Sequence, residues 1–343
     1  MILAANFYKL SVLISVTFLF SCSNNKEENN HFKLVKGFAQ GTTYSIKYKD
    51  VFDRDFSYSF DSILKVIDQQ LSTYDSTSFI SKVNNLSDTC ISLKGNDLFH
   101  FCFNYSKKMA SLTNGFFNPA VYPLVNYWGF YNDTIPIIDS MFIKDSILIY
   151  VDLDLNFKIT KRNSEDFLCK KNKKSKLDFN AVAQGYSVDL IADFLNNNGV
   201  IHYLIEIGGE LAAKGSNMNG EPWKIGIEKP VDNSYAAEHT FQNIIELNNK
   251  SLATSGNYRK FKIINGQKVA HSINPKTGYP AINNLLSVTV ISDNAAQADA
   301  LATAFMVMGK EETISYIKTH SKDSILCYMV YDSLNEYKEW SNF

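Results

Sequence analysis

An acidic residue and a hydroxyl residue lie four positions apart in one of the most apolar stretches of this chain. The stretch DNAAQADALATAFMVMG, residues 293–309, predicts a buried helix with Asp299 and Thr303 on one face. An ionised carboxylate is costly to bury unless a cation or hydrogen-bond donors compensate it. Carboxylate and hydroxyl oxygens suit a hard cation such as Mg²⁺, which keeps positions open for phosphates. Alternatively, Asp299 accepts backbone N–H groups and Thr303 bonds to its own helix.

Two further segments have features of a phosphate site. In LDFNAVAQGYSVD, residues 177–189, the end of a strand leads into a helix whose first-turn N–H groups can hold a phosphate. A kinked backbone near Ala183 would offer a carbonyl oxygen to a metal. In EIGGEL, residues 206–211, paired glycines inside a strand pattern indicate a bulge, or the close approach of another backbone or a ligand.

A histidine lies in a loop that the sequence predicts to be rigid. His271 begins HSINPKTGYP, in which the turn Pro275–Gly278 fixes the loop. A histidine held beside a phosphate site can position or deprotonate a hydroxyl nucleophile. The alternative is an ordinary hydrogen-bonded loop histidine.

The elements that position these residues are helices and strands in an irregular order. Helical spacing in residues 61–75 places Leu64, Ile67 and Leu71 on one face. We expect further helices at 96–115, closed by Asn114-Gly115, and at 181–199. Strand patterns cover residues 38–50, 202–215, 222–230, 251–266 and 285–292. We also expect short strands over residues 138–178. The basic run 170–176 within them is expected to be a solvated hairpin tip. Without a regular βαβ alternation or a linker, this order predicts a single large α+β domain.

Charge and cysteine content exclude some classes of function. The 343 residues include 34 basic and 35 acidic ones, so the charge balance gives no support for nucleic-acid binding. Beyond Cys22, the cysteines at 90, 102, 169 and 327 form no CxxC motif and no zinc-site spacing. Disulfide connectivity cannot be inferred from these positions, and we expect scattered buried thiols.

The first residues resemble an export signal. The apolar run Leu10–Phe20 is too short to span a bilayer, which favours a cleaved signal peptide over residues 1–21. Leu19 to Cys22 resembles a bacterial lipobox, in which Cys22 becomes the lipidated first residue; the alternative is a secretory signal with an incidental cysteine. Residues 22–33 have the composition of a flexible tether, and the folded domain is expected over 34–343.

Nine segments of the chain, in this order, together resemble the ApbE family. They are GTTYSIKY, STYDSTSFISKVNN, TNGFFNPAVYPLVNYWGF, DFNAVAQGYSVD, EIGGEL, PWKIGIEKP, LATSGNYR, HSINPKTGYP and DALATA. The resemblance runs from about Phe38 to Cys327. It implies an ApbE-like α+β fold and an FAD:protein FMN transferase, which cleaves FAD, releases AMP and attaches FMN to a threonine hydroxyl of an acceptor protein.

The resemblance also implies roles for individual residues. Asp299, Thr303 and the Ala183 carbonyl would bind Mg²⁺, and the catalytic residues would be Asp299 and His271, with His271 orienting or activating the acceptor threonine. FAD contacts carried over by position are Gln40, Tyr74, Phe116, Phe117, Asn118, Asn180, Tyr186, His271 and Ile273. The chain departs from the family pattern at four positions: Gln40 replaces Met, Asn118 replaces Asp, Asn180 replaces Gly and Gln184 replaces Lys.

The family resemblance places the protein in the cell envelope. It implies a lipid anchor, a position facing the periplasm on either the inner or the outer membrane, and exported acceptor flavoproteins such as subunits of membrane redox complexes. Two alternatives remain open from the sequence. One is an FAD pyrophosphatase that gives FMN and AMP, and the other is a non-catalytic FAD-binding lipoprotein.

Overall fold

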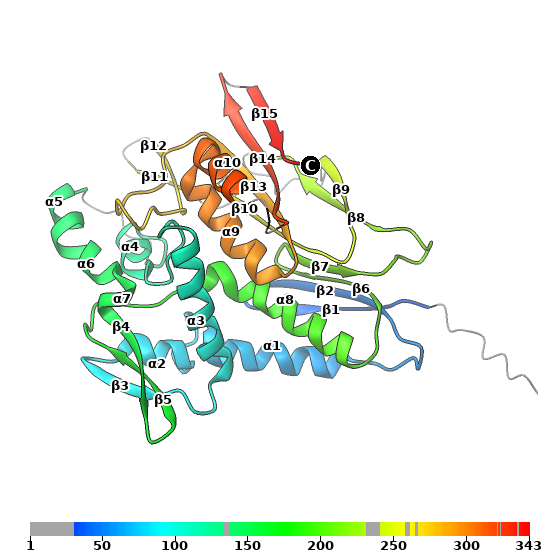
Figure 1. Cartoon of the computed structure of the whole chain (residues 1–343), viewed down its shortest axis with the longest axis horizontal. Helices are drawn as coiled ribbons and strands as arrows, with labels where there is room; N and C mark the ends of the chain where they lie inside the picture. Colours follow the sequence, from blue (N-terminus) through cyan, green and yellow to red (C-terminus); the bar gives the residue numbers. More distant parts are fainter. Residues whose placement is uncertain are drawn as a thin grey trace, which may run out of the picture.

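One antiparallel sheet organises the molecule (Figure 1). The structure is a computed structural model that describes residues 31–132, 138–230, 241–257, 261–264, 267–320, 322, 324–334 and 336–343. Within these residues the sheet has eight strands in the order β1-β2-β6-β7-β10-β13-β14-β15. Their bounds are β1 (Lys33–Ala39), β2 (Thr42–Lys49), β6 (His202–Ile207), β7 (Glu210–Lys214), β10 (Ser251–Gly256), β13 (Leu285–Ser292), β14 (Leu326–Ser333) and β15 (Glu336–Ser341). The predicted α+β class is confirmed, and the predicted signal peptide and most of the tether lie outside the described residues.

Helices cover one face of this sheet and bury the main core against it (Figure 1). They are α1 (Ser57–Leu71), α2 (Phe79–Asn85), α3 (Asp97–Leu112), α8 (Asn180–Asn197), α9 (Ala295–Met308) and α10 (Lys310–Thr319). The predicted apolar face of α1 is confirmed, since Leu64, Ile67 and Leu71 are buried. Helix α9 is buried on nearly every side, as its apolar composition predicted.

A two-stranded ribbon covers part of the opposite face of the sheet. Strands β8 (Trp223–Glu228) and β9 (Phe241–Leu247) pair with each other and bury a second, smaller core. Trp223 and Ile245 contribute to this core from the ribbon, and Leu252 and Ile291 contribute from the sheet. A separate pair, β11 (Phe261–Ile264) and β12 (Gln267–Ala270), precedes the loop that contains His271.

The helix end predicted at Asn114-Gly115 is present in the structure, and α9 has a side-chain cap at its start. The side chain of Asn294 caps α9 by accepting the N–H of Gln297 at 2.9 Å. Asn114 and Gly115 end α3 with positive φ angles of 49° and 78°. The Gly115 N–H donates to the Ala110 carbonyl at 2.8 Å, which satisfies a carbonyl of the last turn.

Short helical elements occupy most of residues 140–156, so the prediction of short strands from residue 138 onward was wrong for this part. The segment contains α5 (Ser140–Phe142), the π-helical turn η1 (Ile143–Ile147), α6 (Leu148–Val151) and α7 (Leu153–Asn156), and it packs beside α4 (Tyr122–Tyr127). Ile143, Ile147 and Val151, spaced four apart, form a third core with Leu124 and Trp128. The predicted strands follow as β4 (Phe157–Arg162) and β5 (Glu165–Lys170), which form a small sheet with β3 (Thr89–Ser92).

The basic run 170–176 is not a hairpin tip, because the tip between β4 and β5 lies at residues 163–164. Lys170 is buried and donates from Nζ to the Asn84 carbonyl at 2.6 Å. Burial lowers the pKa of Lys170 to about 8. This side chain therefore holds the end of α2, and only the lysines that follow it lie toward solvent.

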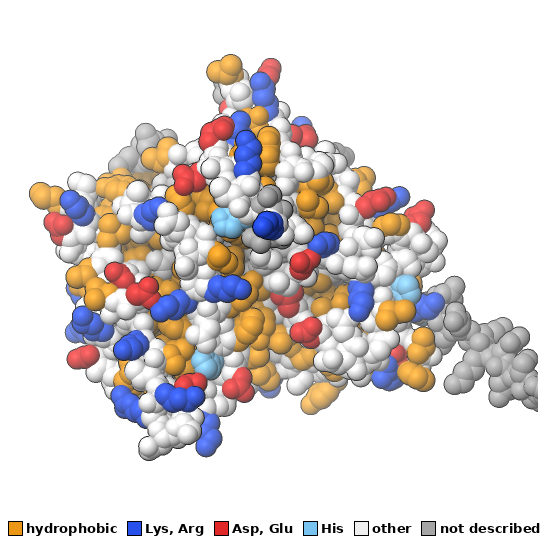
Figure 2. All heavy atoms as spheres, viewed as in Figure 1, with side chains coloured by type: hydrophobic (Ala, Val, Ile, Leu, Met, Phe, Trp, Pro, Cys, Tyr) orange, Lys and Arg blue, Asp and Glu red, His pale blue; other side chains and the backbone are white. Residues whose placement is uncertain are grey.

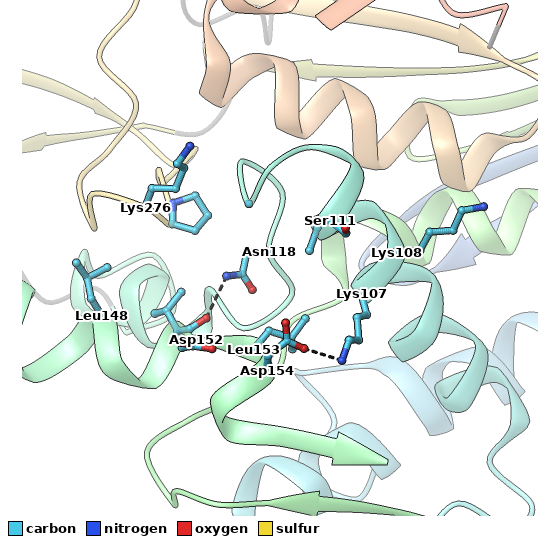
Figure 3. A pocket seen from close by; sticks show the side chains of 13 residues that line it. Lys107, Lys108, Ser111, Asn118, Leu148, Asp152, Leu153, Asp154 and Lys276 are labelled. Atoms are coloured by element: carbon cyan, nitrogen blue, oxygen red, sulfur yellow. Dashed lines mark hydrogen bonds and ion pairs between the residues drawn. The ribbon is translucent and has the colours of Figure 1, made fainter. Parts of the chain in front are cut away.

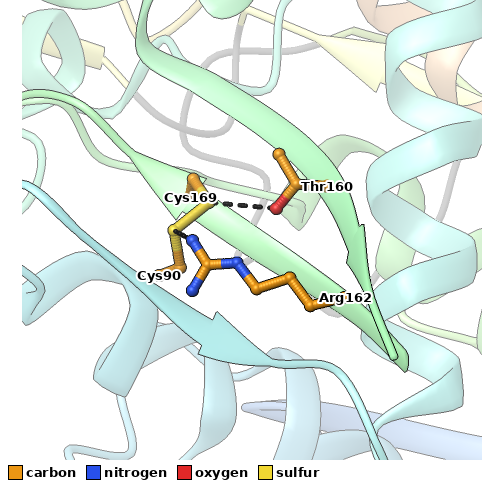
Figure 4. The surroundings of a disulfide bond; sticks show 4 residues. All are labelled: Cys90, Thr160, Arg162 and Cys169. Atoms are coloured by element: carbon orange, nitrogen blue, oxygen red, sulfur yellow. Dashed lines mark hydrogen bonds between the residues drawn. A yellow bond between two sulfur atoms is a disulfide. The ribbon is translucent and has the colours of Figure 1, made fainter. Parts of the chain in front are cut away.

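Two of the four described cysteines form a disulfide, which corrects the expectation of scattered thiols. Cys90 on β3 and Cys169 on β5 are direct partners in the strand register and are joined by the bond (Figure 4). Cys102 and Cys327 are buried thiols, as expected. No helix of the described residues is sufficiently long and apolar to cross a membrane.

Candidate functional site

The crossing of α8 and α9 brings the buried Asp299 against the α8 backbone. A Cβ on Gly185 would lie 2.4 Å from the carbonyl oxygen of Ala295, so only glycine permits this approach. The Gly185 N–H donates to Oδ2 of Asp299 at 3.2 Å. Asp299 is 5% exposed, and this is its only hydrogen bond among the described residues. The crossing thus buries a carboxylate with a single donor.

The first turn of α8 is kinked, and the kink is tied to the β1–β2 turn. Ala181 has non-helical angles, φ −90° and ψ 19°. The Ala183 carbonyl accepts the hydroxyl of Ser187 at 2.6 Å, and that hydroxyl in turn accepts Nε2 of Gln40. Gln40 lies in the turn between β1 and β2 with φ 54°. The structure therefore brings together two of the predicted residues, Gln40 and Ala183, through Ser187.

Thr303 lies one helical turn after Asp299 and is half-buried. Its Oγ1 is 3.4 Å from Oγ of Ser255 on β10. Beside it, Thr254 and Thr289 bond to each other across β10 and β13 at 2.9 Å. Thr303 thus points to the sheet side of α9, and within the described part of the chain its side chain has one long contact with another hydroxyl.

The paired glycines form a turn, so the alternative of a bulge was wrong. Gly208 and Gly209 join β6 to β7 with φ angles of 63° and 108°. The predicted approach of another backbone is not confirmed here, because the atoms nearest to a Cβ on Gly208 would be in side chains, Nε2 of Gln184 at 2.7 Å and Cγ2 of Thr42 at 2.9 Å. This turn, the β1–β2 turn and the start of α8 therefore converge at one end of the sheet.

The buried Asp299 and the half-buried Asp189 flank the helix crossing, and both have raised pKa values. Burial raises the pKa of Asp299, and the negative charge of Asp189 adds to the effect, while the Gly185 N–H opposes it. Asp189 on α8 accepts the N–H groups of Ala295 and Ala296 at 2.7 and 2.9 Å. Burial raises its pKa to about 6. This role of Asp189 was not predicted, although its place one turn after Gly185 is a usable signal.

The atoms present at the crossing fit a hard divalent cation. The described residues contain no group of three His, Cys, Asp or Glu side chains arranged to hold a metal. The predicted set consists instead of one carboxylate, one hydroxyl and one backbone carbonyl, all oxygen donors of the kind that Mg²⁺ prefers. Asp299 is compensated by one N–H, whereas an ionised carboxylate has about four acceptor sites. A cation would supply the missing compensation.

Tyr74 and Asn180, both predicted to contact FAD, lie in one aromatic cluster. The ring of Tyr74 is 6.1 Å from that of Tyr131, and Nδ2 of Asn180 donates to the Tyr131 hydroxyl at 3.0 Å. The Tyr131 hydroxyl donates to Asp178, and its ring stacks on Tyr122 at 4.5 Å. Burial together with the Asp178 charge raises the pKa of Tyr131. Sequence reasoning missed Tyr131 and Asp178, because no spacing links them to Tyr74.

The predicted residues 116–118 divide between the core and a large cavity. Asn118 lines a cavity of about 770 Å³, which Lys107, Lys108 and Lys276 also line (Figure 3). Nζ of Lys276 lies 4.2 Å from the ring centre of Phe116. Phe117 is buried in the main core, so it supports the cavity from behind and does not face it.

Asn118 holds its loop through hydrogen bonds. Its Nδ2 donates to the Val151 carbonyl at 3.0 Å, and its Oδ1 accepts the Ala120 N–H at 2.8 Å. Both polar ends of this side chain are therefore engaged within the protein.

Hydrogen bonds hold the turn that follows His271. The Gly278 N–H donates to the Asn274 carbonyl at 2.8 Å, and Trp128 donates from Nε1 to the Gly278 carbonyl at 2.8 Å. Ile273 is buried in the third core, and the His271 ring lies edge-on to Phe130 at 6.3 Å. The loop is also next to the large cavity, because Pro275 and Lys276 line that cavity.

Tyr186 lies apart from the other predicted FAD contacts. Its ring stacks on Phe101 at 4.2 Å and lines a second cavity, of about 530 Å³. Asp189 and Tyr105 also line this cavity, whereas Asn118 and Lys276 line the first one. The structure thus joins Gln40 to Ala183, Tyr74 to Asn180, and Phe116 to the His271 loop, but it leaves Tyr186 on another surface of α8.

Comparisons with known proteins point to one family. The ApbE family model matches residues 40–329. A protein of Vibrio cholerae serotype O1 named FAD:protein FMN transferase is 32% identical over 340 residues, which cover 96% of both chains. The protein of the same name from Escherichia coli K12 is 28% identical, with 98% of this chain and 95% of that protein covered.

Solved structures give the same result. The flavin transferase ApbE from Vibrio cholerae has a TM-score of 0.76 and 30% identity, with 91% of this chain and 97% of that chain covered. The Pseudomonas stutzeri flavinyl transferase ApbE, in its apo form, has a TM-score of 0.79 and 30% identity, with 91% and 94% covered.

Proposed function

This chain belongs to the ApbE family, and on that premise we propose that it is an enzyme that transfers FMN from FAD to an acceptor protein. One observation carries the proposal at the level of the site. The α8–α9 crossing buries the Asp299 carboxylate against a single N–H donor, beside a hydroxyl one helical turn away. Such a carboxylate is suited to a bound cation, and a reaction at a pyrophosphate requires one for charge neutralisation.

The proposed cation is Mg²⁺, with Asp299, Thr303 and the Ala183 carbonyl as its protein ligands. When bound, it would neutralise pyrophosphate charge and polarise the bond that is cleaved. The residues of this chain position those ligands. The Gly185 N–H fixes one oxygen of Asp299, and the Gln40–Ser187 pair fixes the direction of the Ala183 carbonyl.

The proposed FAD site extends from this crossing to the large cavity. Tyr74 and Asn180, held by Tyr131, offer an aromatic and an amide contact for the flavin or adenine ring. Phe116, which lies under the Lys276 ammonium, and the His271–Ile273 loop, which leads into Pro275 and Lys276, would offer further contacts, because Pro275 and Lys276 line the cavity. In the proposed reaction His271 orients the acceptor threonine hydroxyl, FMN becomes attached through its phosphate, and AMP leaves.

A reconstituted reaction tests this function. The protein is incubated with FAD and Mg²⁺, with and without a co-purified candidate acceptor, and the acceptor mass and free AMP are measured. Covalent FMN on a threonine, with AMP released in equal amount, is the expected result. Fast AMP release without acceptor would favour the FAD pyrophosphatase. Bound FAD with no AMP, regardless of Mg²⁺, would favour a non-catalytic FAD-binding lipoprotein.

The proposed location is the cell envelope, with the domain facing the periplasm and a lipid on Cys22. The sequence of residues 10–22 supports it, as does the Cys90–Cys169 disulfide, since such bonds persist mainly in oxidising compartments. The acceptors would then be exported proteins, such as subunits of membrane redox complexes. Mass spectrometry of the mature N-terminus tests this, because an acylated cysteine at its first position is expected and an unmodified Cys22 would contradict it.

A further inference from the structure

Several exposed apolar side chains lie at the end of the sheet where β1 begins. Val51 and Phe52, in the turn after β2, are 65% and 69% exposed. Ile201, just before β6, is 58% exposed, and Met218, in the loop between β7 and β8, is 66% exposed. We call these four side chains the basal patch. Single exposed apolar residues are ordinary on protein surfaces, but a group of them at one end of a molecule indicates an interaction surface.

The strand register places these segments side by side. Lys33 at the start of β1 pairs with Tyr48 near the end of β2, and Lys49 pairs with His202 at the start of β6. The Ser216 N–H donates to Nδ1 of His202 at 2.9 Å, which brings the β7–β8 loop to the same end. In Figure 1 this end is at right, and Figure 2 shows hydrophobic side chains there among charged ones.

The charges around the basal patch suit a lipid headgroup region. Lys33 pairs with Asp53 at 2.9 Å, and Arg54, which pairs with Asp50 at 2.6 Å, has its guanidinium 5.2 Å from the ring centre of Phe52. Lys49 and Lys214 are on the strand ends beside them. Basic groups next to protruding aromatic and aliphatic side chains are the pattern of a surface that lies in the membrane interface.

The length of the tether limits how far this end is from the membrane. If Cys22 carries a lipid, ten residues (23–32) separate it from β1. Fully extended, such a segment spans at most about 35 Å, and as a flexible coil about 16–19 Å. The end that carries the basal patch is therefore the part of the described chain held nearest the bilayer.

We propose that the basal patch inserts into the surface of the lipid bilayer and orients the enzyme on it. This inference rests on the proposed lipid attachment at Cys22. The predicted site is at the other end of β1, β2 and α8, because the β1–β2 turn and the start of α8 meet there. Helix α8 has 18 residues and is about 27 Å long. With the basal patch in the bilayer surface, the site would therefore lie about that far above the membrane, facing the periplasm.

The test uses the full chain, processed in cells and reconstituted into vesicles of phosphatidylethanolamine and phosphatidylglycerol. Phe52→Cys and, separately, Ile201→Cys are labelled with an environment-sensitive dye. The natural thiols Cys102 and Cys327 are 0% exposed and will not react. The matched control is Leu334→Cys, 93% exposed at the β14–β15 tip, which is at the top in Figure 1. Vesicles with nitroxide-labelled lipid acyl chains provide the quencher.

The labels at 52 and 201 are expected to lose fluorescence by about twofold or more, while the label at 334 does not change. If the protein floats with the vesicles but the nitroxide quenches all three labels equally, the basal patch does not contact lipid. That result would overturn the proposal and leave the lipid anchor supported. A dye that is shifted to the blue without nitroxide quenching would indicate a protein partner and would overturn the proposal. A chain that does not float with the vesicles would overturn both the anchor and the proposal.

Discussion

A buried aspartate lies near each end of α8, and the two differ in how their negative charge is neutralised. At the basal end, Asp50 accepts Nε and Nη2 of Arg54 at 3.0 and 2.6 Å, and the Arg54 side chain also donates to the Asn198 carbonyl after α8. Arg54 lowers the pKa of Asp50. At the site end, Asp299 has one N–H donor and no cation among the described residues, and burial raises its pKa.

This difference in charge neutralisation indicates that Asp50 has a structural role and that Asp299 is suited to binding a ligand. A buried charge that the protein itself neutralises contributes to the stability of the fold and has no capacity left for a ligand. A buried charge that is left under-compensated costs stability, and such groups are concentrated at functional sites. Among the described residues, the fold supplies an arginine to Asp50 and none to Asp299, where Mg²⁺ is proposed to bind.

Replacing the two aspartates should therefore have different consequences. Asp299→Asn is expected to reduce FMN transfer by about 100-fold or more, because it removes the charged metal ligand, while the protein remains folded. Asp50→Asn is expected to lower the free energy of unfolding by about 2 kcal/mol without changing the activity of the folded enzyme. Acceptor mass spectrometry and urea unfolding measure the two effects. Full activity in Asp299→Asn would remove the basis of the proposed metal site.

Gly185→Ala tests whether the close helix crossing is required. Its Cβ would lie 2.4 Å from the Ala295 carbonyl oxygen, so α8 and α9 must separate and the bond to Asp299 must lengthen. We expect a loss of about 1–3 kcal/mol in unfolding free energy together with weaker Mg²⁺ dependence of transfer. Asn197→Ala, at the exposed basal end of α8, is the control and should change neither. An unaltered Mg²⁺ titration of Gly185→Ala would contradict the assignment.

Thr303→Val should reduce FMN transfer by about tenfold, since it removes one neutral oxygen ligand and preserves shape. Thr303→Ser retains the hydroxyl and is expected to restore most of the rate. Thr254→Val, on the neighbouring strand, removes the bond to Thr289 and should affect stability alone. The readout is the rate of transfer at several Mg²⁺ concentrations. Equal rates in the Val and Ser variants at position 303 would exclude a metal contact there.

The smallest expected effect is the pH dependence of stability. Burial raises the pKa of Asp189 to about 6 from an ordinary value of 3.8, so the folded protein holds this proton more tightly than the unfolded chain does. Its contribution to stability is full below pH 3.8 and is lost as the pH rises toward 6. Relative to Asp189→Asn, the native protein should gain about 1 kcal/mol between pH 7 and pH 5. A loss over the same interval would mean that Asp189 is compensated in the way that Asp50 is.

Asp50 should show the opposite dependence. Its pKa is lowered in the folded protein, so its contribution is present above the ordinary carboxyl value and is lost as the pH falls below it. Unfolding of Asp50→Asn and the native protein at pH 3 and pH 6 measures this.

Local patterns predicted the long helices and the family, but they did not predict the contacts between elements. The face of α1 and the cap of α9 follow from spacing within a few residues. The short helices at 138–156 depend on Ile143, Ile147 and Val151 packing against α4. Helices this short are not stable alone, so their apolar spacing is a weak signal.

The candidate site was predictable in its residues and not in its partners. Asp299 and Thr303 share a helix, so their proximity could be inferred. The partners come from segments distant in sequence. Gly185 donates its N–H to Asp299, and the Tyr131 hydroxyl accepts the side-chain amide of Asn180. The disulfide was missed for the same reason, since Cys90 and Cys169 are brought together only by the β3–β5 register.

That disulfide closes a covalent ring around a large part of the chain. The bond joins positions 79 residues apart, and the enclosed segment contains α3 and all of α4 to α7. A single proteolytic cut anywhere inside this segment would leave both pieces in one molecule, with the walls of the large cavity still attached to each other. Nicked protein would then migrate at full size on a non-reducing gel and separate only after a thiol is added.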